Sequence, residues 1–117
     1  MRQLGWLAGI VFLYWVAALC YRPWVHKKPD LSAAYLRLAA DDVRRGRLDQ
    51  AIREGEVAVR VNPSHAIAHY NLGCYLLDAG RLDDAEREFQ EVLRLEPGAD
   101  LARMQLRRLR EVRARGR

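Results

Sequence analysis

A chain of 117 residues has room for one small domain and little else, which excludes a large multidomain enzyme. Its net charge of +5 divides unevenly: residues 1–28 carry four basic groups and no acid, residues 29–102 nine arginines and fourteen acids, and residues 103–117 seven arginines and one acid. The body is therefore acidic, and its two cysteines, in separate segments, predict neither an intramolecular disulfide nor a zinc site.

The first element in the chain is an apolar run. After a short tail of residues 1–3, residues 4–21 read LGWLAGIVFLYWVAALCY without a charged side chain. At about 1.5 Å of rise per residue, such a helix approaches the thickness of the hydrocarbon core of a bilayer. The run therefore predicts an uncleaved transmembrane helix. A cleaved signal peptide would need a shorter apolar core and a small-residue cleavage site, and a buried helix of a soluble protein is the other alternative.

Flanking charges suggest how such a span would be oriented. The residues after the run, a basic and proline-containing linker at 22–31, carry one more positive charge than the residues before it, so the positive-inside rule favours a cytoplasmic body. The expected localisation is a single-pass protein of a bacterial inner membrane, with a periplasmic body as the alternative. Four residues of the run are expected to pack on another transmembrane helix, because glycines let helices approach and mid-span aromatics favour a protein partner: Gly5, Gly9, Tyr14 and Trp15.

The body repeats itself with a period of 34 residues, residues 32–65 matching residues 66–99 at eleven positions. The clearest match is GRLDQAIREG, which starts at residue 46, against GRLDDAEREF, which starts at residue 80. Apolar and small residues in each copy follow helical spacing, interrupted by glycine and proline. The pattern predicts an all-α fold in which each copy is a helical hairpin.

Four residues are expected to shape the turns of these hairpins. Gly46 and Gly80 would end the first helix of each copy in the left-handed conformation. Asp49 and Asp83 would cap the second helix and complement its dipole. A proline at the end of each copy would then block the helix, and Ser64 could cap the one that follows.

Residues 68–97, AHYNLGCYLLDAGRLDDAEREFQEVLRLEP, resemble a tetratricopeptide repeat, a helix-turn-helix unit of 34 residues, and residues 32–65 resemble a less regular copy. The resemblance implies a protein-interaction module without catalytic activity, in which the first helices line a concave groove that binds a peptide or a helix. By this resemblance the groove residues would be Ala33, Leu36, Arg37, Ala40, Val43, Ile67, Tyr70, Asn71, Cys74 and Leu77. Leu36 and Tyr70 have an alternative role, which is to pack between helices.

The first copy departs from the family pattern. Asp42 stands where a large apolar residue is usual, and we interpret it with Asp41 as a surface acid beside an irregular core position. Gly55 stands opposite Phe89 of the second copy and should weaken the packing. Arg37 and Asn71 match part of a carboxylate clamp, but the third helix offers Leu101 and Gln105 in place of basic residues, which disfavours a receptor for carboxylate tails.

Residues 100–117 are expected to form a capping helix, to about residue 114, with an arginine-rich tail. Ala102, Leu106, Leu109 and Val112 recur at helical spacing and would seal the second repeat. Seven arginines would face water: Arg103, Arg107, Arg108, Arg110, Arg113, Arg115 and Arg117. Anionic lipid or an acidic protein is the alternative contact for this tail, and nucleic acid is disfavoured because no aromatic residue is interleaved with the arginines.

No residue pattern predicts catalysis, a metal site or a cofactor. His65 and His69 are four residues apart, but no further ligand is placed to complete a metal site. Cys74 is interpreted as a small apolar residue rather than a nucleophile. The expected function is a membrane-anchored adaptor or assembly factor whose partners are membrane proteins, with a small permanent subunit of a membrane complex as the alternative.

Overall fold

The computed structural model describes the backbone of residues 4–25 and 30–116, and the side chains of residues 5–20 and 30–116. Within these residues the protein has six α-helices and no strand, which confirms the all-α prediction. The chain divides into two compact units, Met1–Asp30 and Leu31–Arg117. The predicted tail 1–3, residues 26–29 of the predicted linker, and Arg117 lie outside the described residues.

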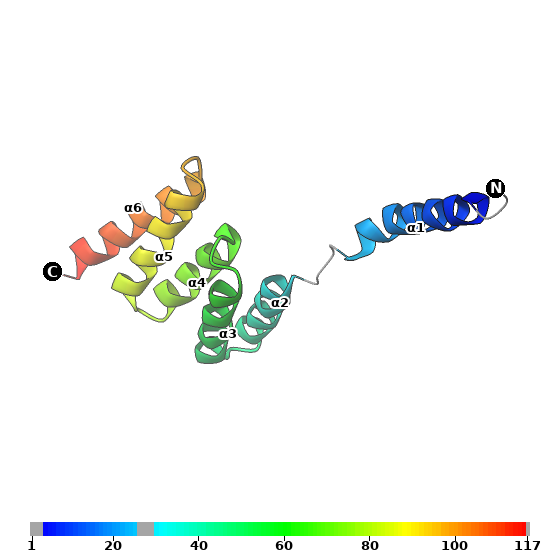
Figure 1. Cartoon of the computed structure of the whole chain (residues 1–117). Helices are drawn as coiled ribbons and strands as arrows, with labels where there is room; N and C mark the ends of the chain where they lie inside the picture. The colour runs from blue at the N-terminus through cyan, green and yellow to red at the C-terminus, as the bar shows by residue number, and fades with distance from the viewer. Residues whose placement is uncertain (1–3, 26–29, 117) are drawn as a thin grey trace. The chain divides into compact units, whose positions relative to one another are not determined.

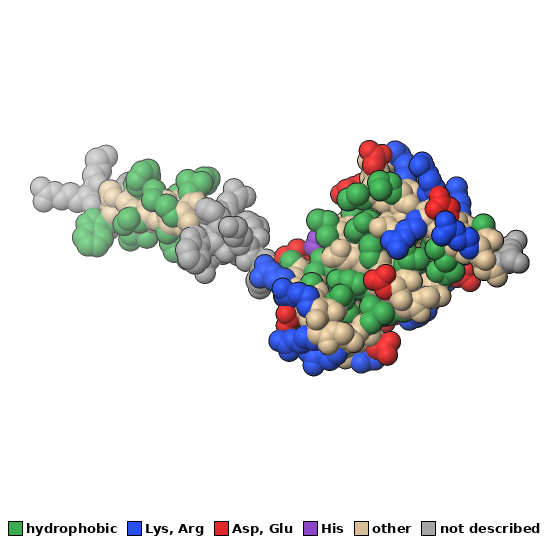
Figure 2. Space-filling model, turned by 180° about the vertical axis from the view of Figure 1, so that it is seen from behind, with side chains coloured by type: hydrophobic (Ala, Val, Ile, Leu, Met, Phe, Trp, Pro, Cys, Tyr) green, Lys and Arg blue, Asp and Glu red, His purple; other side chains and the backbone are tan. Residues whose placement is uncertain are grey.

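The first unit contains one helix, α1 (Leu4–Val25). All of its described side chains are exposed, including Trp6 at 79% and Phe12 at 70%. Its visible face in Figure 2 carries hydrophobic side chains and no charged ones among the coloured residues. The apolar side chains are distributed around the helix rather than gathered on one side, so α1 is not an amphipathic helix.

The predicted membrane anchor is wrong. Across the part of the chain that the structure describes, no helix combines the length and the apolar character that crossing a bilayer demands. A span needs about 20 predominantly apolar residues; the uncharged run stops at 18, contains Gly5, Gly9, Tyr14 and Trp15, and is followed within α1 by Arg22. The expected single-pass inner-membrane localisation is therefore corrected as well.

The second unit is a series of antiparallel helices in which each helix packs on the next (Figure 1). These helices are α2 (Leu31–Arg44), α3 (Leu48–Val61), α4 (Ala66–Asp78), α5 (Leu82–Leu95) and α6 (Asp100–Arg115). In addition α2 contacts α4, and α4 contacts α6, whereas α3 and α5 make no such contact within the described residues. Hence α2, α4 and α6 form the inner, concave row of the unit.

Two glycines make the turns within the hairpins, as expected. Gly46 has φ +74° and Gly80 has φ +76°, and no other described residue has a positive φ. A side chain in this region costs roughly 1–2 kcal/mol because Cβ approaches the following carbonyl oxygen. The backbone N–H of Arg47 then donates to the carbonyl of Asp42, and that of Arg81 to the carbonyl of Leu76, which closes both helix ends in the same way.

The predicted side-chain caps are not formed. Arg47 and Arg81 occupy the N-cap positions of α3 and α5 and make no capping hydrogen bond. Asp49 and Asp83 lie inside the first turn, one residue too far along the chain to be N-caps, where their charge still complements the helix dipole. His65, not Ser64, precedes α4, without a side-chain cap.

The core is built around a ring that needs a glycine opposite it. Phe89 on α5 is fully buried, and a Cβ added to Gly73 on α4 would lie 2.7 Å from the Phe89 Cε1 atom. In the first repeat the pair is reversed: Ala39 has the Cβ and Gly55 lacks the side chain. Gly55 leaves no hole, since its Cα faces Leu72, whose Cδ1 atom would be 3.2 Å from an added Cβ. The expected weak position is therefore a close approach of α3 to α4.

Asp42 is not a surface acid. The residue is 7% exposed, and its carboxylate forms an ion pair with the Arg47 guanidinium at 2.6 Å. The Arg47 side chain is 55% exposed and therefore lets water reach one side of the pair. This partner satisfies the buried charge that would otherwise be costly at a core position.

Two buried polar residues fasten the loop between the repeats. Ser32 is fully buried, and its hydroxyl donates to the Ala58 carbonyl oxygen at 3.1 Å. Since that hydroxyl has one hydrogen, the His65 Nδ1–H must donate to the Ser32 oxygen, 2.8 Å away. His69 lies between the Pro63 carbonyl oxygen, 2.8 Å from its Nε2, and the Glu88 carboxylate, 2.7 Å from its Nδ1.

The last helix closes the repeat domain as expected, except at its end. Ala102, Leu106 and Leu109 are buried, whereas Val112 is 43% exposed. Arg113 does not face water alone, because its guanidinium pairs with Glu86 at 2.6 Å and with Asp83, both on α5. Three exposed arginines occupy the positions of α6 that pack on a second helix in the earlier repeats: Arg103, Arg107 and Arg110.

Candidate functional site

The predicted groove residues lie on the inner helices α2 and α4, but they are not equally accessible. On α2, Arg37 and Ala40 are exposed, Ala33 and Val43 are half-buried, and Leu36 is only 9% exposed. Leu36 packs with Ala58 and Ala68 in a small core cluster. For Leu36 the structure therefore favours the packing role over a groove role.

The inner face of α4 is more open. Ile67 is 60% exposed, and four other predicted residues are half-buried: Tyr70, Asn71, Cys74 and Leu77. A cavity of about 280 Å³ opens beside the first turns of α4 and α6. Its lining is mostly apolar and comes from α4, α5, α6 and the loop before α6: Ala66, Ile67, Tyr70, Val92, Glu96, Ala99, Asp100, Leu101 and Ala102.

Three exposed apolar side chains surround this region, two of which were not among the predicted groove residues. Leu101 is 62% exposed and Met104 is 60% exposed on α6, next to Ile67 on α4. Their signal in the sequence was the repeat itself, since Leu101 and Met104 follow Ile67 and Tyr70 by 34 residues. Interpreting the last helix only as a cap concealed its contribution to the inner row.

Tyr70 connects the two inner helices. Its ring packs on Phe89 with centroids 5.9 Å apart and planes at 58°, and its hydroxyl accepts a hydrogen bond of 3.3 Å from Gln105 Nε2. The other amide atom, Gln105 Oε1, is buried and has no partner within the described residues. The floor of the groove thus offers a free acceptor beside an aromatic wall.

Cys74 lies one turn further along α4 from Tyr70. Burial raises the pKa of the Cys74 thiol above its ordinary value of 9.0, the Coulomb effect of Asp78 raises it further, and the hydrogen bond with Tyr70 and the charge of Arg108 lower it by less. A raised pKa keeps the thiol protonated at neutral pH, which makes it a poor nucleophile. Cys74 can therefore serve as part of an apolar surface.

Charge is divided along the inner row. The two charged residues that line the cavity, Glu96 and Asp100, are both acidic and exposed. Asp100 is paired with Arg103 at 2.8 Å, with the Asp100 side chain 84% exposed. Further along α6, Arg108 acts on Cys74. The cavity end of the groove is therefore acidic and the far end contains a basic residue.

The tail arginines have different roles. Arg113 joins α6 to α5, and Arg103 bonds Asp100 and the Pro97 carbonyl oxygen. Four others are exposed and form no ion pair within residues 30–116: Arg107, Arg108, Arg110 and Arg115. The solvated-face interpretation fits these four, while Arg113 is structural.

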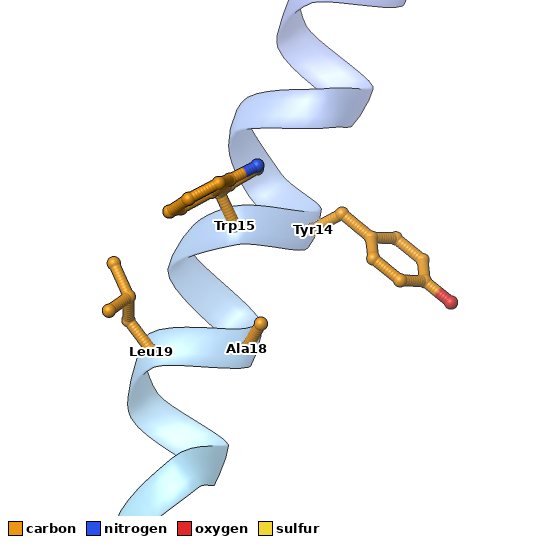
Figure 3. Close-up of a pocket in the computed structure, with 4 residues that line it drawn as sticks. All are labelled: Tyr14, Trp15, Ala18 and Leu19. Atoms are coloured by element: carbon orange, nitrogen blue, oxygen red, sulfur yellow. The ribbon is translucent and has the colours of Figure 1, made fainter.

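The residues predicted to pack on a second transmembrane helix all lie on α1 with exposed side chains, except for the two glycines, which have no side chain to pack. Tyr14, Trp15, Ala18 and Leu19 border an open depression of about 400 Å³ (Figure 3). Trp15 and Leu19 project to one side of the helix and Tyr14 to the other. Since one helix alone provides the walls, this depression is not an enclosed site.

Comparisons with known proteins identify the repeats. The tetratricopeptide repeat profile matches residues 36–100 and 70–108, which together are more than half of the chain. The search of curated proteins gives no match. Among solved structures, the chain is similar in fold to the first TPR domain of Spaghetti (RPAP3) bound to an HSP90 peptide, SRMEEVD, with a TM-score of 0.69 and 24% identity over 84% of this chain and 78% of that chain. This chain belongs to the tetratricopeptide repeat family.

Proposed function

We propose that the protein is an adaptor or assembly factor that binds a peptide or helix of a partner protein along its inner row. The observation that carries this proposal is the apolar cavity of about 280 Å³ between α4 and α6, flanked by exposed Ile67 and Leu101. Large apolar side chains that remain exposed next to a hollow are typical of protein-binding grooves. The RPAP3 domain, which has the same fold, is described as bound to a peptide, and this supports the same use here.

The size of the cavity indicates what would enter it. Sites for whole small molecules usually measure about 300–1,000 Å³, so a cavity of about 280 Å³ suits part of a ligand, such as one or two side chains of a peptide. The unpaired Gln105 oxygen can accept a hydrogen bond from a peptide N–H, which would fix the orientation of the chain. Both features favour a peptide over a metabolite.

The test begins with the full chain immobilised and panned against a library of random peptides. Binding of the selected peptides is then measured with Ile67→Glu and Leu101→Glu, which place a carboxylate at the mouth of the cavity. We expect each substitution to weaken binding at least tenfold, because an apolar anchor would meet an unpaired charge.

Leu38→Glu is the matched control. Leu38 is a similarly exposed apolar residue, at 52%, and does not line the cavity, so its substitution should leave the affinity within about twofold. Equal affinities for all three variants would mean that the peptides bind elsewhere on the chain, and the groove proposal would be abandoned.

A second candidate is a permanent subunit of a larger complex, and α1 is the observation that favours it. Every described side chain of α1 is exposed although the helix is apolar on all sides, and such helices are usually buried in a larger assembly. Stoichiometric recovery with one complex that resists high salt would support this role. Release of every partner by moderate salt would contradict it and leave the adaptor role.

A further inference from the structure

The cavity between α4 and α6 has a charge pattern that specifies its ligand more narrowly than the proposed function does. Apolar atoms form its floor, through Tyr70, Val92 and Ala102. Its only two charged lining residues are Glu96 and Asp100, and no basic residue lines it among those described. A ligand that fills this cavity therefore places an apolar group inside and meets negative charge at the rim.

We propose that the cavity takes a large apolar side chain of a partner peptide whose neighbouring residues are basic. This inference rests on the proposed function, because it names the chemistry of the peptide at the same site. Lysine or arginine next to the anchor would approach Glu96 and Asp100, while an acidic neighbour would be repelled. Complementary charge at a rim selects among partners more than it adds to the total affinity.

Arg103 does not cancel this preference. It pairs with Asp100 and the Pro97 carbonyl oxygen, but its side chain is 55% exposed and that of Asp100 is 84% exposed, so water screens the pair. Glu96 is exposed and forms no ion pair within the described residues. At least one full carboxylate charge therefore remains at the rim for a ligand.

The charge distribution along α6 gives the bound peptide a direction. Asp100 begins the helix at the cavity, whereas Arg107, Arg108 and Arg110 lie in its second half. A basic segment is thus attracted to the first turn of α6 and repelled from its later turns. The basic residues of the partner are expected to lie next to the anchor and not at the far end of the groove.

The test uses the full chain and three short peptides of one length: a leucine flanked by lysines, a leucine flanked by glutamates, and an alanine flanked by lysines. The lysine-flanked leucine should bind roughly 3- to 10-fold more tightly than the glutamate-flanked leucine at low salt, because each rim pair contributes modestly. It should also bind at least tenfold more tightly than the alanine peptide, which cannot fill the cavity.

Variants of the rim separate a local effect from the general acidity of the domain. The double variant Glu96→Gln/Asp100→Asn should remove the preference for lysine, and Glu96→Lys/Asp100→Lys should reverse it. Glu111→Gln, an exposed acid that does not line the cavity, should change nothing. These substitutions conserve size or lie on exposed positions, so folding can be checked by circular dichroism for each.

Each result decides the proposal. Equal binding of the two leucine peptides, or a preference that survives in the double variant, overturns the basic-neighbour inference. Alanine and leucine peptides that bind equally overturn the apolar anchor. If library-selected peptides bind through Ile67 and Leu101 without a charge preference, the inference fails and the proposed function stands; if no peptide binds at all, both fail.

Discussion

Gly73 on α4 lies against the ring of Phe89 on α5 so closely that a Cβ at Gly73 would be 2.7 Å from Cε1 and 3.0 Å from Cδ1 and Cζ. The ring is fully buried and cannot turn away into solvent. The glycine at this point of a helix therefore determines how near α4 and α5 approach each other.

We expect Gly73→Ala to destabilise the repeat domain by about 1–3 kcal/mol, since the overpacking exceeds the roughly 1 kcal/mol gained in helix propensity. Urea unfolding followed by circular dichroism measures it. Gly55→Ala is the matched variant: its Cβ would lie 3.2 Å from the flexible end of Leu72, so the net change should stay within about 1 kcal/mol of zero. An equal loss in both variants would show that the Phe89 contact does not set the spacing.

The two turn glycines should respond alike. Gly46→Ala and Gly80→Ala each force a side chain into φ near +75°, and we expect a loss of about 1–2 kcal/mol in each case. Gly98→Ala is the control, because Gly98 has no positive φ and no atom near an added Cβ, and it should be neutral or slightly stabilising. The measurement is again the free energy of unfolding in urea.

Ser32→Ala should cost about 1–3 kcal/mol. The substitution leaves the Ala58 carbonyl oxygen without the hydroxyl donor and removes the acceptor of the His65 ring N–H. Ser64→Ala provides the comparison, since Ser64 is exposed and its hydroxyl makes no hydrogen bond within the described residues. If both serine variants unfold at the same urea concentration, the buried hydrogen bonds contribute nothing net.

Arg113→Ala should lower the thermal unfolding midpoint more than Arg110→Ala does. Hydrogen bonding to Glu86 raises the pKa of the Arg113 guanidinium, and the charges of Glu86 and Asp83 act in the same direction, whereas Arg110 has no ion pair within the described residues. Because salt screens exposed charges, the difference between the variants should shrink in about 1 M salt, where the Debye length is about 3 Å. A difference that persists in high salt would indicate packing of the arginine stem instead.

The Cys74 thiol should react slowly with iodoacetamide. Burial raises its pKa above the ordinary 9.0, so the thiolate fraction at pH 8 is smaller than in the unfolded chain. In a Cys20→Ser background the alkylation rate should rise with pH to values above 9 and increase on unfolding in urea. Tyr70→Phe removes the hydrogen bond that lowers this pKa and should slow the reaction further. Equal rates in native and unfolded protein would contradict this.

Local sequence patterns predicted the repeat architecture well. The 34-residue period, Gly46 and Gly80 specify helices and turns through interactions between near neighbours, so they are readable without a structure. Asp42, Ser32 and Arg113 were misjudged or missed because their partners come from the turn, the next helix or a distant helix, and no local pattern indicates which polar group will face them. The apolar run at residues 4–21 misled for another reason: an uncharged composition indicates that a helix lacks polar partners but does not establish a membrane span.

The three arginines on the outer side of α6 limit how this protein could be lengthened. A further helix placed there would cover Arg103, Arg107 and Arg110 with nothing to neutralise them, at a cost of several kcal/mol for each buried charge. Duplication of the last repeat would therefore give a folded longer array only if these guanidinium groups were replaced at the same time. Charge on one helix face thus fixes the number of repeats that can follow.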